Sequence, residues 1–158
     1  MKTTILILSI ILLSFSNFVF AKTINGKPRI VDGDTIHIKS NKIRLHGIDA
    51  PETKQTCKID NEEWYCGKQS TKELKKLISN QKVKCITNDV DIYNRFVAIC
   101  YVNEININQW MVENGWAIAY RYYSTDYIVE EKHARDNKLG IWKSDFMKPY
   151  AYRQQNKK

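Results

Sequence analysis

The sequence lacks several features that direct the interpretation of other chains. No two of its four cysteines have Cys-x-x-Cys spacing, so a zinc site has little support. After Ala21 there is no internal repeat, no low-complexity block and no linker rich in proline, glycine or serine. We therefore expect one domain over residues 22–150, followed by a disordered basic tail at residues 151–158.

Long hydrophobic runs are also scarce, and the main one lies at the N-terminus. Residues 5–20 are apolar apart from a few serines and one asparagine, and a membrane span needs about 20 apolar residues. The run ends in Val19-Phe20-Ala21, which matches the cleavage pattern of a secretory signal. We interpret residues 1–21 as a signal peptide and expect a secreted or periplasmic protein without stable membrane insertion. The alternative is an uncleaved N-terminal anchor.

Acidic side chains are in the minority. The chain has 17 Asp and Glu against 25 Lys and Arg, a formal net charge of +8. A surface with this excess attracts polyanions, which include nucleic acids and anionic membrane faces. Charge by itself does not choose between these two partners.

The few acidic residues of the early chain are unevenly placed. Four of them form two short clusters, Asp32 with Asp34 and Asp49 with Glu52. Their mutual repulsion would be relieved by a hard cation, which prefers carboxylate and carbonyl oxygens as ligands. Arg44 lies between the clusters, and its planar guanidinium suits two phosphate oxygens. A metal ion, an arginine and a basic surface together point to phosphodiester chemistry.

The cysteines Cys57, Cys66, Cys85 and Cys100 all lie in the part expected to be exported. An even number in an oxidising compartment indicates two disulfides, with three possible connectivities. Cys85 and Cys100 are equidistant from a turn at residues 92–93, which places them opposite each other across a hairpin. We favour the pairs Cys85–Cys100 and Cys57–Cys66.

Residue periodicity predicts a small mixed fold. Strands are expected at residues 26–31, 35–39, 42–48, 83–86 and 96–102. Helices are expected at residues 67–78 and 105–113, and a last one from Ser124 or Asp126 to Leu139, with an extended segment at 116–123. Five strands with helices after the third and the fifth predict a five-stranded OB-fold β-barrel with about three packed helices. This fold often binds nucleic-acid chains.

Three segments resemble the signature motifs of one family. V-D-G-D-T (Val31–Thr35), R-L-H-G-I-D-A-P-E (Arg44–Glu52) and D-I-Y-N-R (Asp91–Arg95) resemble, in order and spacing, those of the staphylococcal-nuclease-like (thermonuclease) family. The similarity in layout continues to Leu139–Trp142 and so covers nearly the whole exported chain. The resemblance implies an OB-fold and calcium-dependent hydrolysis of phosphodiesters in DNA or RNA. We also expect a monomer.

The resemblance also implies a set of groups that hold the metal. Asp34, Asp49 and the backbone carbonyl of Ala50 would bind Ca²⁺ directly. Asp32 and Glu52 would hold the water molecules around the ion. Glu52 would in addition orient or deprotonate the attacking water.

A second set of implied residues contacts the substrate. Arg44 and Arg95 would bind the scissile phosphate and stabilise the charge that develops on it. Tyr93 would hydrogen-bond a terminal phosphate, and Tyr120 and Tyr122 would line the nucleotide pocket. Most of these residues have a simpler alternative, since the arginines could pair with surface carboxylates, and Tyr120 and Tyr122 could pack on the barrel.

The sequence departs from the family pattern in a few places. Ala50 replaces a threonine of which only the backbone oxygen is needed. Ile92 replaces a lysine, which predicts weaker substrate binding, and Asn94 replaces a glycine at a turn where Asn is tolerated. The segment between Cys57 and Cys66 is an insertion, and its Trp64 could stack on substrate or anchor the loop. His46 has no second histidine near it in the sequence, so we interpret it as structural.

Two other classes of protein remain as alternatives. One is a non-catalytic OB-fold protein that binds single-stranded nucleic acid through charge and aromatic side chains. The other is a disulfide-bonded structural protein that binds anionic envelope surfaces. The presence of Arg44, Glu52 and Arg95 together favours the enzyme, because a binding protein has no need of all three.

Overall fold

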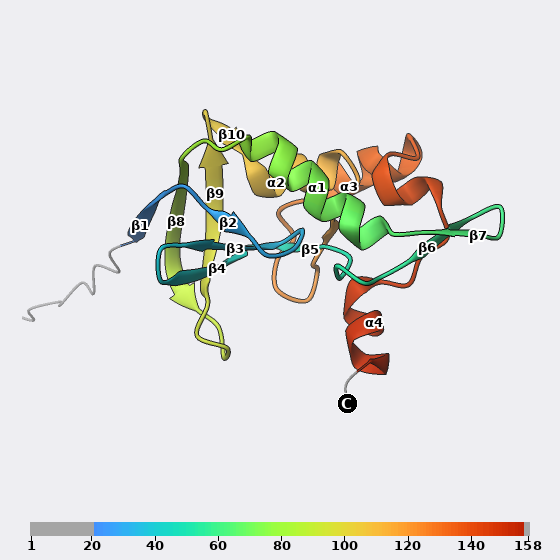
Figure 1. Cartoon of the computed structure of the whole chain (residues 1–158), viewed down its shortest axis with the longest axis horizontal. Helices are drawn as coiled ribbons and strands as arrows, with labels where there is room; N and C mark the ends of the chain where they lie inside the picture. Colours follow the sequence, from blue (N-terminus) through green and yellow to red (C-terminus); the bar gives the residue numbers. More distant parts are fainter. Residues whose placement is uncertain (1–20, 157–158) are drawn as a thin grey trace, which may run out of the picture.

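A curled mixed β-sheet forms the centre of the fold. The structure is a computed structural model, and it describes residues 21–156 (Figure 1). The strand order is β1-β8-β9-β4-β3-β2, with β10 paired to β9. The β4–β9 pair is parallel and the other pairs are antiparallel. The strands are β1 (Lys22–Gly26), β2 (Arg29–Ile30), β3 (Thr35–Ile38), β4 (Asn41–Leu45), β8 (Val83–Val90), β9 (Phe96–Val102) and β10 (Ile105–Asn106).

Two short strand pairs lie outside this sheet. β5 (Ile48–Asp49) pairs with β11 (Ile118–Ala119), which ties the end of the β4 segment to a distant part of the chain. β6 (Cys57–Ile59) and β7 (Glu62–Trp64) form a hairpin that projects from the body (Figure 1).

The helices divide into a group that packs on the sheet and one that does not. They are α1 (Cys66–Ile78), α2 (Ile107–Glu113), α3 (Ile128–Asp136), the 3-10 helix η1 (Gly140–Lys143) and α4 (Pro149–Gln155). Figure 1 shows α1, α2 and α3 together on one side, with α4 apart from them near the C-terminal end of the chain. In α1, Leu74 and Ile78 are buried while Lys75 and Lys76 are exposed, as an amphipathic helix requires.

The core lies between the curled sheet and the first helices. Ile36, Ile38 and Ile43 are fully buried on adjacent strands, because alternate residues of a strand face the same side. The sheet curls so tightly that the end of β1 meets β3. A Cβ atom on Gly26 would lie 2.7 Å from the Ile38 side chain, so glycine permits this approach.

The predicted OB-type barrel with packed helices is confirmed. The strand expected at residues 96–102 matches β9, and the helices expected at 67–78 and 105–113 correspond to α1 and α2. The strand expected at residues 83–86 is longer, because β8 continues to Val90. Its additional residues pair with β9 in the hairpin, although they lie beyond the apolar residues from which the strand was predicted.

Other expected boundaries are wrong. Of the strand expected at residues 26–31, only β2 (Arg29–Ile30) is a separate strand, and β1 (Lys22–Gly26) is an earlier strand that was not expected. Only β11 is extended within residues 116–123, and Arg121–Tyr123 form a turn. α3 begins at Ile128 without a side-chain cap from Ser124 or Asp126, because the Ser124 hydroxyl accepts the Asp126 N–H within the preceding loop. Residues 151–155, expected to be disordered, belong to α4.

Both predicted disulfides are confirmed. Cys85 and Cys100 lie directly opposite in the β8–β9 register, as their equal distance from the hairpin turn predicted. Cys57 and Cys66 join β6 to the start of α1. No cysteine of residues 21–156 is free.

Residues 1–20 of the expected signal peptide lie outside the described residues. In the described part of the chain, no helix combines the length and the hydropathy needed to cross a bilayer.

Candidate active site

Two acidic segments that are separate in the sequence meet at one end of the sheet. The turn before β3 is closed by a hydrogen bond from the Val31 N–H to the Thr35 carbonyl (3.0 Å). Inside it, the Asp34 N–H donates to the Asp32 carboxylate (3.0 Å). The second segment is joined directly to this turn, since the Ala50 N–H donates to Oδ2 of Asp34 (3.0 Å). The two clusters predicted from the sequence therefore form a single site.

Arg44 lies on β4 between the two segments and binds both. Its Nη1 lies 2.7 Å from Oδ1 of Asp34, and its Nη2 lies 3.0 Å from Oδ1 of Asp49. Burial lowers the pKa of Arg44, but the charges of Asp34 and Asp49 outweigh that effect and raise the pKa above its usual value. The planar guanidinium thus bridges two carboxylates that are themselves buried.

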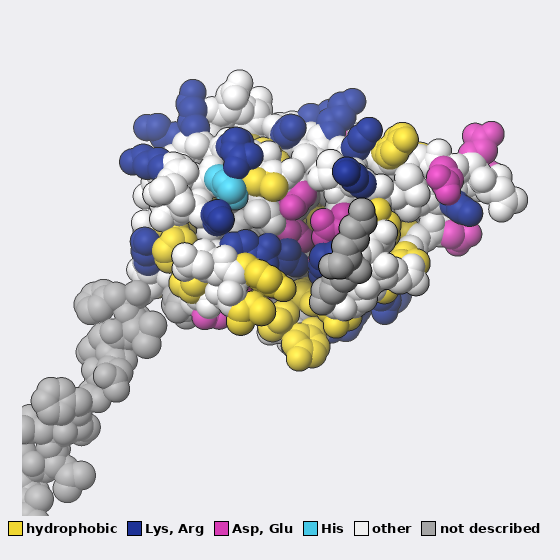
Figure 2. Space-filling model, turned by 60° about the horizontal axis from the view of Figure 1, so that its bottom comes forward, with side chains coloured by type: hydrophobic (Ala, Val, Ile, Leu, Met, Phe, Trp, Pro, Cys, Tyr) yellow, Lys and Arg dark blue, Asp and Glu magenta, His cyan; other side chains and the backbone are white. Residues whose placement is uncertain are grey.

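The carboxylates repel one another. Burial and the nearby charge of Asp34 raise the pKa of Asp32 to about 7, with a smaller contribution from Glu52. Burial and the charge of Asp34 also raise the pKa of Asp49. Figure 2 shows acidic side chains gathered in the middle of one face, with Lys, Arg and hydrophobic side chains beside them. The site is therefore a local excess of negative charge on a basic protein.

This donor set fits a hard divalent cation. Oδ2 of Asp49 is buried and has no hydrogen-bond partner, which is costly unless another group binds it. Oxygens of Asp34 and Asp49 and the Ala50 carbonyl are the ligand types that Ca²⁺ prefers. Among residues 21–156 no three His, Cys, Asp or Glu side chains form a ready-made metal cluster, so water would supply the remaining ligands.

We predict that Asp32 makes the metal-free protein less stable at alkaline pH. Its folded-state pKa of about 7 exceeds the ordinary value of 3.8, so the folded protein binds this proton more tightly than the unfolded chain does. The resulting stability is present at acid pH and is lost as the pH rises from about 4 to about 7. In excess chelator, Asp32→Asn should therefore gain stability relative to the wild type between pH 5 and pH 8. Urea unfolding at both pH values measures this difference, and a difference that is independent of pH would contradict it.

Arg95 and Tyr93 lie in the turn between β8 and β9. Arg95 donates to Asp91 through Nε (2.8 Å) and approaches it through Nη2 (2.7 Å), and the Tyr93 ring lies 5.3 Å from its guanidinium. In the parallel β4–β9 register, Arg44 lies opposite Val97. Arg95 precedes Val97 by two residues, so its side chain faces the same side of the sheet as those of Val97 and Arg44. This register puts Arg95 on the face that bears Arg44, but its ion pair is with Asp91 and not with the acidic cluster.

The predicted aromatic residues form part of a larger group. The Tyr120 ring lies 6.0 Å from the Arg44 guanidinium and is surrounded by Tyr122, Tyr123 and Tyr150 at centroid distances of 6.4, 5.1 and 6.4 Å. Tyr122 is 81 % exposed, so it does not pack in the core. Tyr120, Tyr122 and Tyr150 line a pocket of about 750 Å³ that reaches Asp49.

Two other residues singled out from the sequence lie away from this chemistry. His46 Nε2 pairs with Asp126 (3.1 Å), which agrees with a structural role. Trp64 packs on the small apolar cluster around Cys57 and Cys66, with Lys143 5.0 Å from its ring centroid. The contacts favour the loop-anchoring alternative for Trp64.

Sequence reasoning missed Arg153, which reaches the acidic cluster from α4. Its Nη1 lies 2.8 Å from Oδ1 of Asp49 and 3.0 Å from Oε1 of Glu52. A disordered tail was expected here because the segment is short, polar and basic. Pro149 after Lys148 was the available indication of a helix start, since proline is favoured in the first turn.

An OB-type barrel with an aromatic pocket beside charged side chains is typical of proteins that bind nucleic-acid or oligosaccharide chains. The family model described as "Staphylococcal nuclease homologue" matches residues 42–144, and the chain belongs to this family. The match includes Arg44, Glu52 and Arg95, whereas Asp34 and Arg153 lie outside it.

Individual relatives agree with this assignment. An "Uncharacterized endonuclease" from Escherichia coli O157:H7 is 35 % identical over 153 residues, covering 91 % of this chain and 94 % of the relative. A "Micrococcal nuclease" from Shigella flexneri is 33 % identical over 147 residues, covering 82 % and 79 %. A "Succinoglycan biosynthesis protein ExoI" from Rhizobium meliloti (strain 1021) is 33 % identical over 132 residues, covering 78 % and 67 %. Family membership supports nuclease activity on nucleic acids.

Proposed function

We propose that this protein is an exported, calcium-dependent nuclease that hydrolyses phosphodiester bonds of DNA or RNA. The observation that carries the proposal is the convergence of Asp34 and Asp49 on Arg44, with a buried oxygen of Asp49 left unpartnered. Export is supported by two disulfides, which form and persist in oxidising compartments.

The metal would be held by Asp34, Asp49 and the Ala50 carbonyl. When bound there, Ca²⁺ supplies a positive charge that polarises a phosphoryl oxygen and favours ionisation of water. Asp32 and Glu52 border this position and would hydrogen-bond the surrounding water. Each of the four carboxylates is positioned by a backbone hydrogen bond or by an arginine.

The remaining chemistry belongs to the protein's own side chains. Arg44, already directed at the carboxylates, would donate to the non-bridging oxygens of the scissile phosphate and stabilise their charge in the transition state. Glu52, whose side chain is about one third exposed, would accept a proton from the attacking water. Arg95 would exchange its contact with Asp91 for a contact with phosphate.

The aromatic pocket would bind the nucleotide next to the scissile phosphate. Tyr120 lies beside Arg44 and Tyr122 lies next to Tyr120, and a base stacked on such a ring is stabilised by about 1–3 kcal/mol. Tyr93 and the exposed Ile92 lie at the tip of the neighbouring turn, where Tyr93 can reach a terminal phosphate. This arrangement favours a single strand, whose bases are free to stack.

Digestion of denatured DNA and of RNA tests the proposal. We expect cleavage with Ca²⁺, loss of cleavage in excess EGTA, and recovery when Ca²⁺ is restored. Glu52→Gln, which alters one atom of a partly exposed side chain, is the matched control, and its much slower cleavage would assign the activity to this site. Undiminished cleavage in EGTA would reject the metal role. Tight binding of an oligonucleotide that stays intact in every metal would support the non-catalytic binding protein instead.

A further inference from the structure

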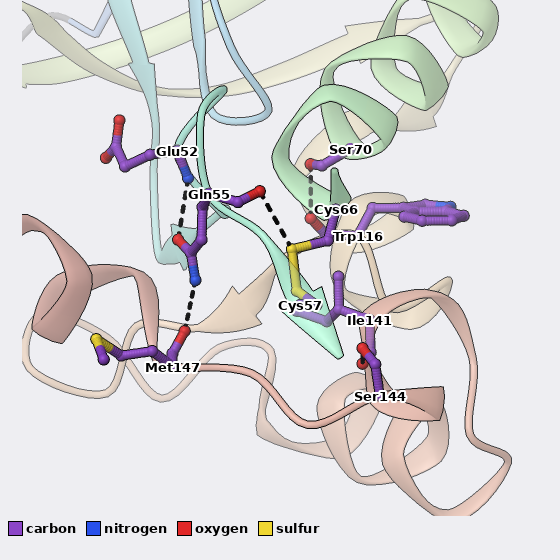
Figure 3. The surroundings of a disulfide bond; sticks show 9 residues. All are labelled: Glu52, Gln55, Cys57, Cys66, Ser70, Trp116, Ile141, Ser144 and Met147. Atoms are coloured by element: carbon purple, nitrogen blue, oxygen red, sulfur yellow. Dashed lines mark hydrogen bonds between the residues drawn. A yellow bond between two sulfur atoms is a disulfide. The ribbon is translucent and has the colours of Figure 1, made fainter. Parts of the chain in front are cut away.

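The inserted loop holds the segment that leads to α4. Lys58 and Asp145 exchange backbone hydrogen bonds, with N–O distances of 2.9 and 2.8 Å. The Gln55 side-chain amide donates to the Met147 carbonyl (2.6 Å), two residues before α4 begins (Figure 3). The C-terminal segment is therefore attached to the loop that follows Glu52 through contacts that lie about 90 residues apart in sequence.

Gln55 also connects this attachment to the active site. Its side chain is fully buried, and its Oε1 accepts the Glu52 N–H (3.2 Å). Its carbonyl oxygen lies 3.5 Å from the sulfur of Cys66, beside the Cys57–Cys66 disulfide (Figure 3). The Gln55 side chain thus holds the backbone of Glu52 next to the segment that precedes α4.

A side chain of α4 also contacts the acidic cluster directly. Arg153 donates from Nη1 to Oε1 of Glu52 (3.0 Å) and lies 2.8 Å from Oδ1 of Asp49. Within residues 21–156, Arg153 is the one residue that the Glu52 carboxylate contacts by hydrogen bond or ion pair. The Asp49 side chain is completely buried, whereas the Glu52 side chain is about one third exposed. Arg153 therefore links the exposed Glu52 carboxylate to the buried Asp49 carboxylate.

We propose that Arg153 is a positioning residue that holds the Glu52 carboxylate over the Asp49 side of the site. A glutamate has several rotatable bonds, and a proton acceptor must lie within hydrogen-bond distance of its water. A guanidinium nitrogen shared by the two carboxylates limits those rotations and offsets their repulsion. The inserted Cys57–Cys66 loop supports this role, because it anchors the chain from which α4 extends.

This inference rests on the proposed function of Glu52. Steady-state kinetics distinguishes a positioning role of Arg153 from direct binding of the substrate phosphate by Arg153. Arg153→Ala should lower kcat by about tenfold to 10²-fold and change KM by no more than about twofold, since loss of orientation acts on turnover. Arg153→Lys keeps a charge that can approach both carboxylates and should restore part of kcat. Gln154→Ala, on the same helix and exposed, is the matched control and should behave like the wild type.

A double-mutant comparison supplies the decisive result. If Arg153 acts through Glu52, Arg153→Ala should slow Glu52→Gln by less than about twofold, because the positioned group has already been removed. Losses that multiply, or a raised KM with kcat retained, would overturn the proposal and assign Arg153 to substrate binding. An Arg153→Ala variant with wild-type kcat would overturn it as well.

A second measurement does not depend on activity. In excess chelator, urea unfolding of the wild type, both single variants and the double variant measures the coupling between Arg153 and Glu52. We expect a coupling of about threefold or more in the unfolding equilibrium constant. No coupling would overturn the contact itself. Inactivity of the wild-type protein with a normal coupling would instead refute the proposed nuclease function and leave the contact intact.

Discussion

Replacing Arg44 with alanine is expected to lower the rate of phosphodiester cleavage by about 10²–10³-fold, the usual cost of removing one charge-stabilising donor. Arg44 is the residue that binds both Asp34 and Asp49, at 2.7 and 3.0 Å. The same substitution should reduce stability in chelator by about 3–5 kcal/mol, because it leaves the buried Asp34 without its ion-pair partner and Asp49 with Arg153 alone. Added Ca²⁺ should recover much of that stability, since it binds the same oxygens.

Two variants make the Arg44 result specific. Arg44→Lys keeps the positive charge but cannot span both carboxylates with a planar fork, so its cleavage rate should remain well below that of the wild type. Arg29→Ala removes an exposed arginine that contacts His37 and should leave rate and stability unchanged. Cleavage by a folded Arg44→Ala variant at a rate within about threefold of the wild type would contradict the role proposed for Arg44.

Gly67→Ala is expected to destabilise the protein by about 1–3 kcal/mol, the usual cost of forcing an atom into a packed site. Helix propensity alone predicts the opposite, since alanine is favoured over glycine by about 1 kcal/mol inside a helix. The contact decides the sign, because a Cβ on Gly67 would overlap the backbone carbonyl of Glu52. Either α1 or the Glu52 loop must then move.

The displacement should also reduce activity, because a shift of about 1 Å at a catalytic group can cost about 10²-fold in rate. Urea unfolding and cleavage rates of Gly67→Ala, with the exposed Lys72→Ala as the control on the same helix, measure the two effects. A stabilised Gly67→Ala variant would show that the helix tolerates the methyl group and would contradict this account of the packing.

These two positions illustrate how far the sequence could lead. Arg44 was identifiable because it stands in a recognisable motif, between acidic residues at fixed spacing. Gly67 carried no such indication, because its importance comes from a backbone carbonyl fifteen positions earlier that packs against it in the folded chain. A local pattern cannot reveal a close approach between two segments.

The contacts in the folded chain bear on the alternatives that the sequence left open. Trp64 packs on the disulfide cluster, which favours the role of an anchor. Tyr122 is largely exposed beside Tyr120, which argues against simple core packing. Arg95 pairs with Asp91 in its own turn, and this contact must break if the arginine is to bind phosphate.

By itself the sequence determined the periodic elements, the hairpin disulfide and the two acidic clusters, because strand alternation, turn chemistry and charge spacing are local properties. Only the tertiary structure decided that Arg153 belongs to the site. Its partners lie about a hundred residues earlier, and its helix is too short to be stable without the contacts made through Gln55 and Lys58. Marginal segments acquire structure from what they pack against, and that information appears only when the chain is folded.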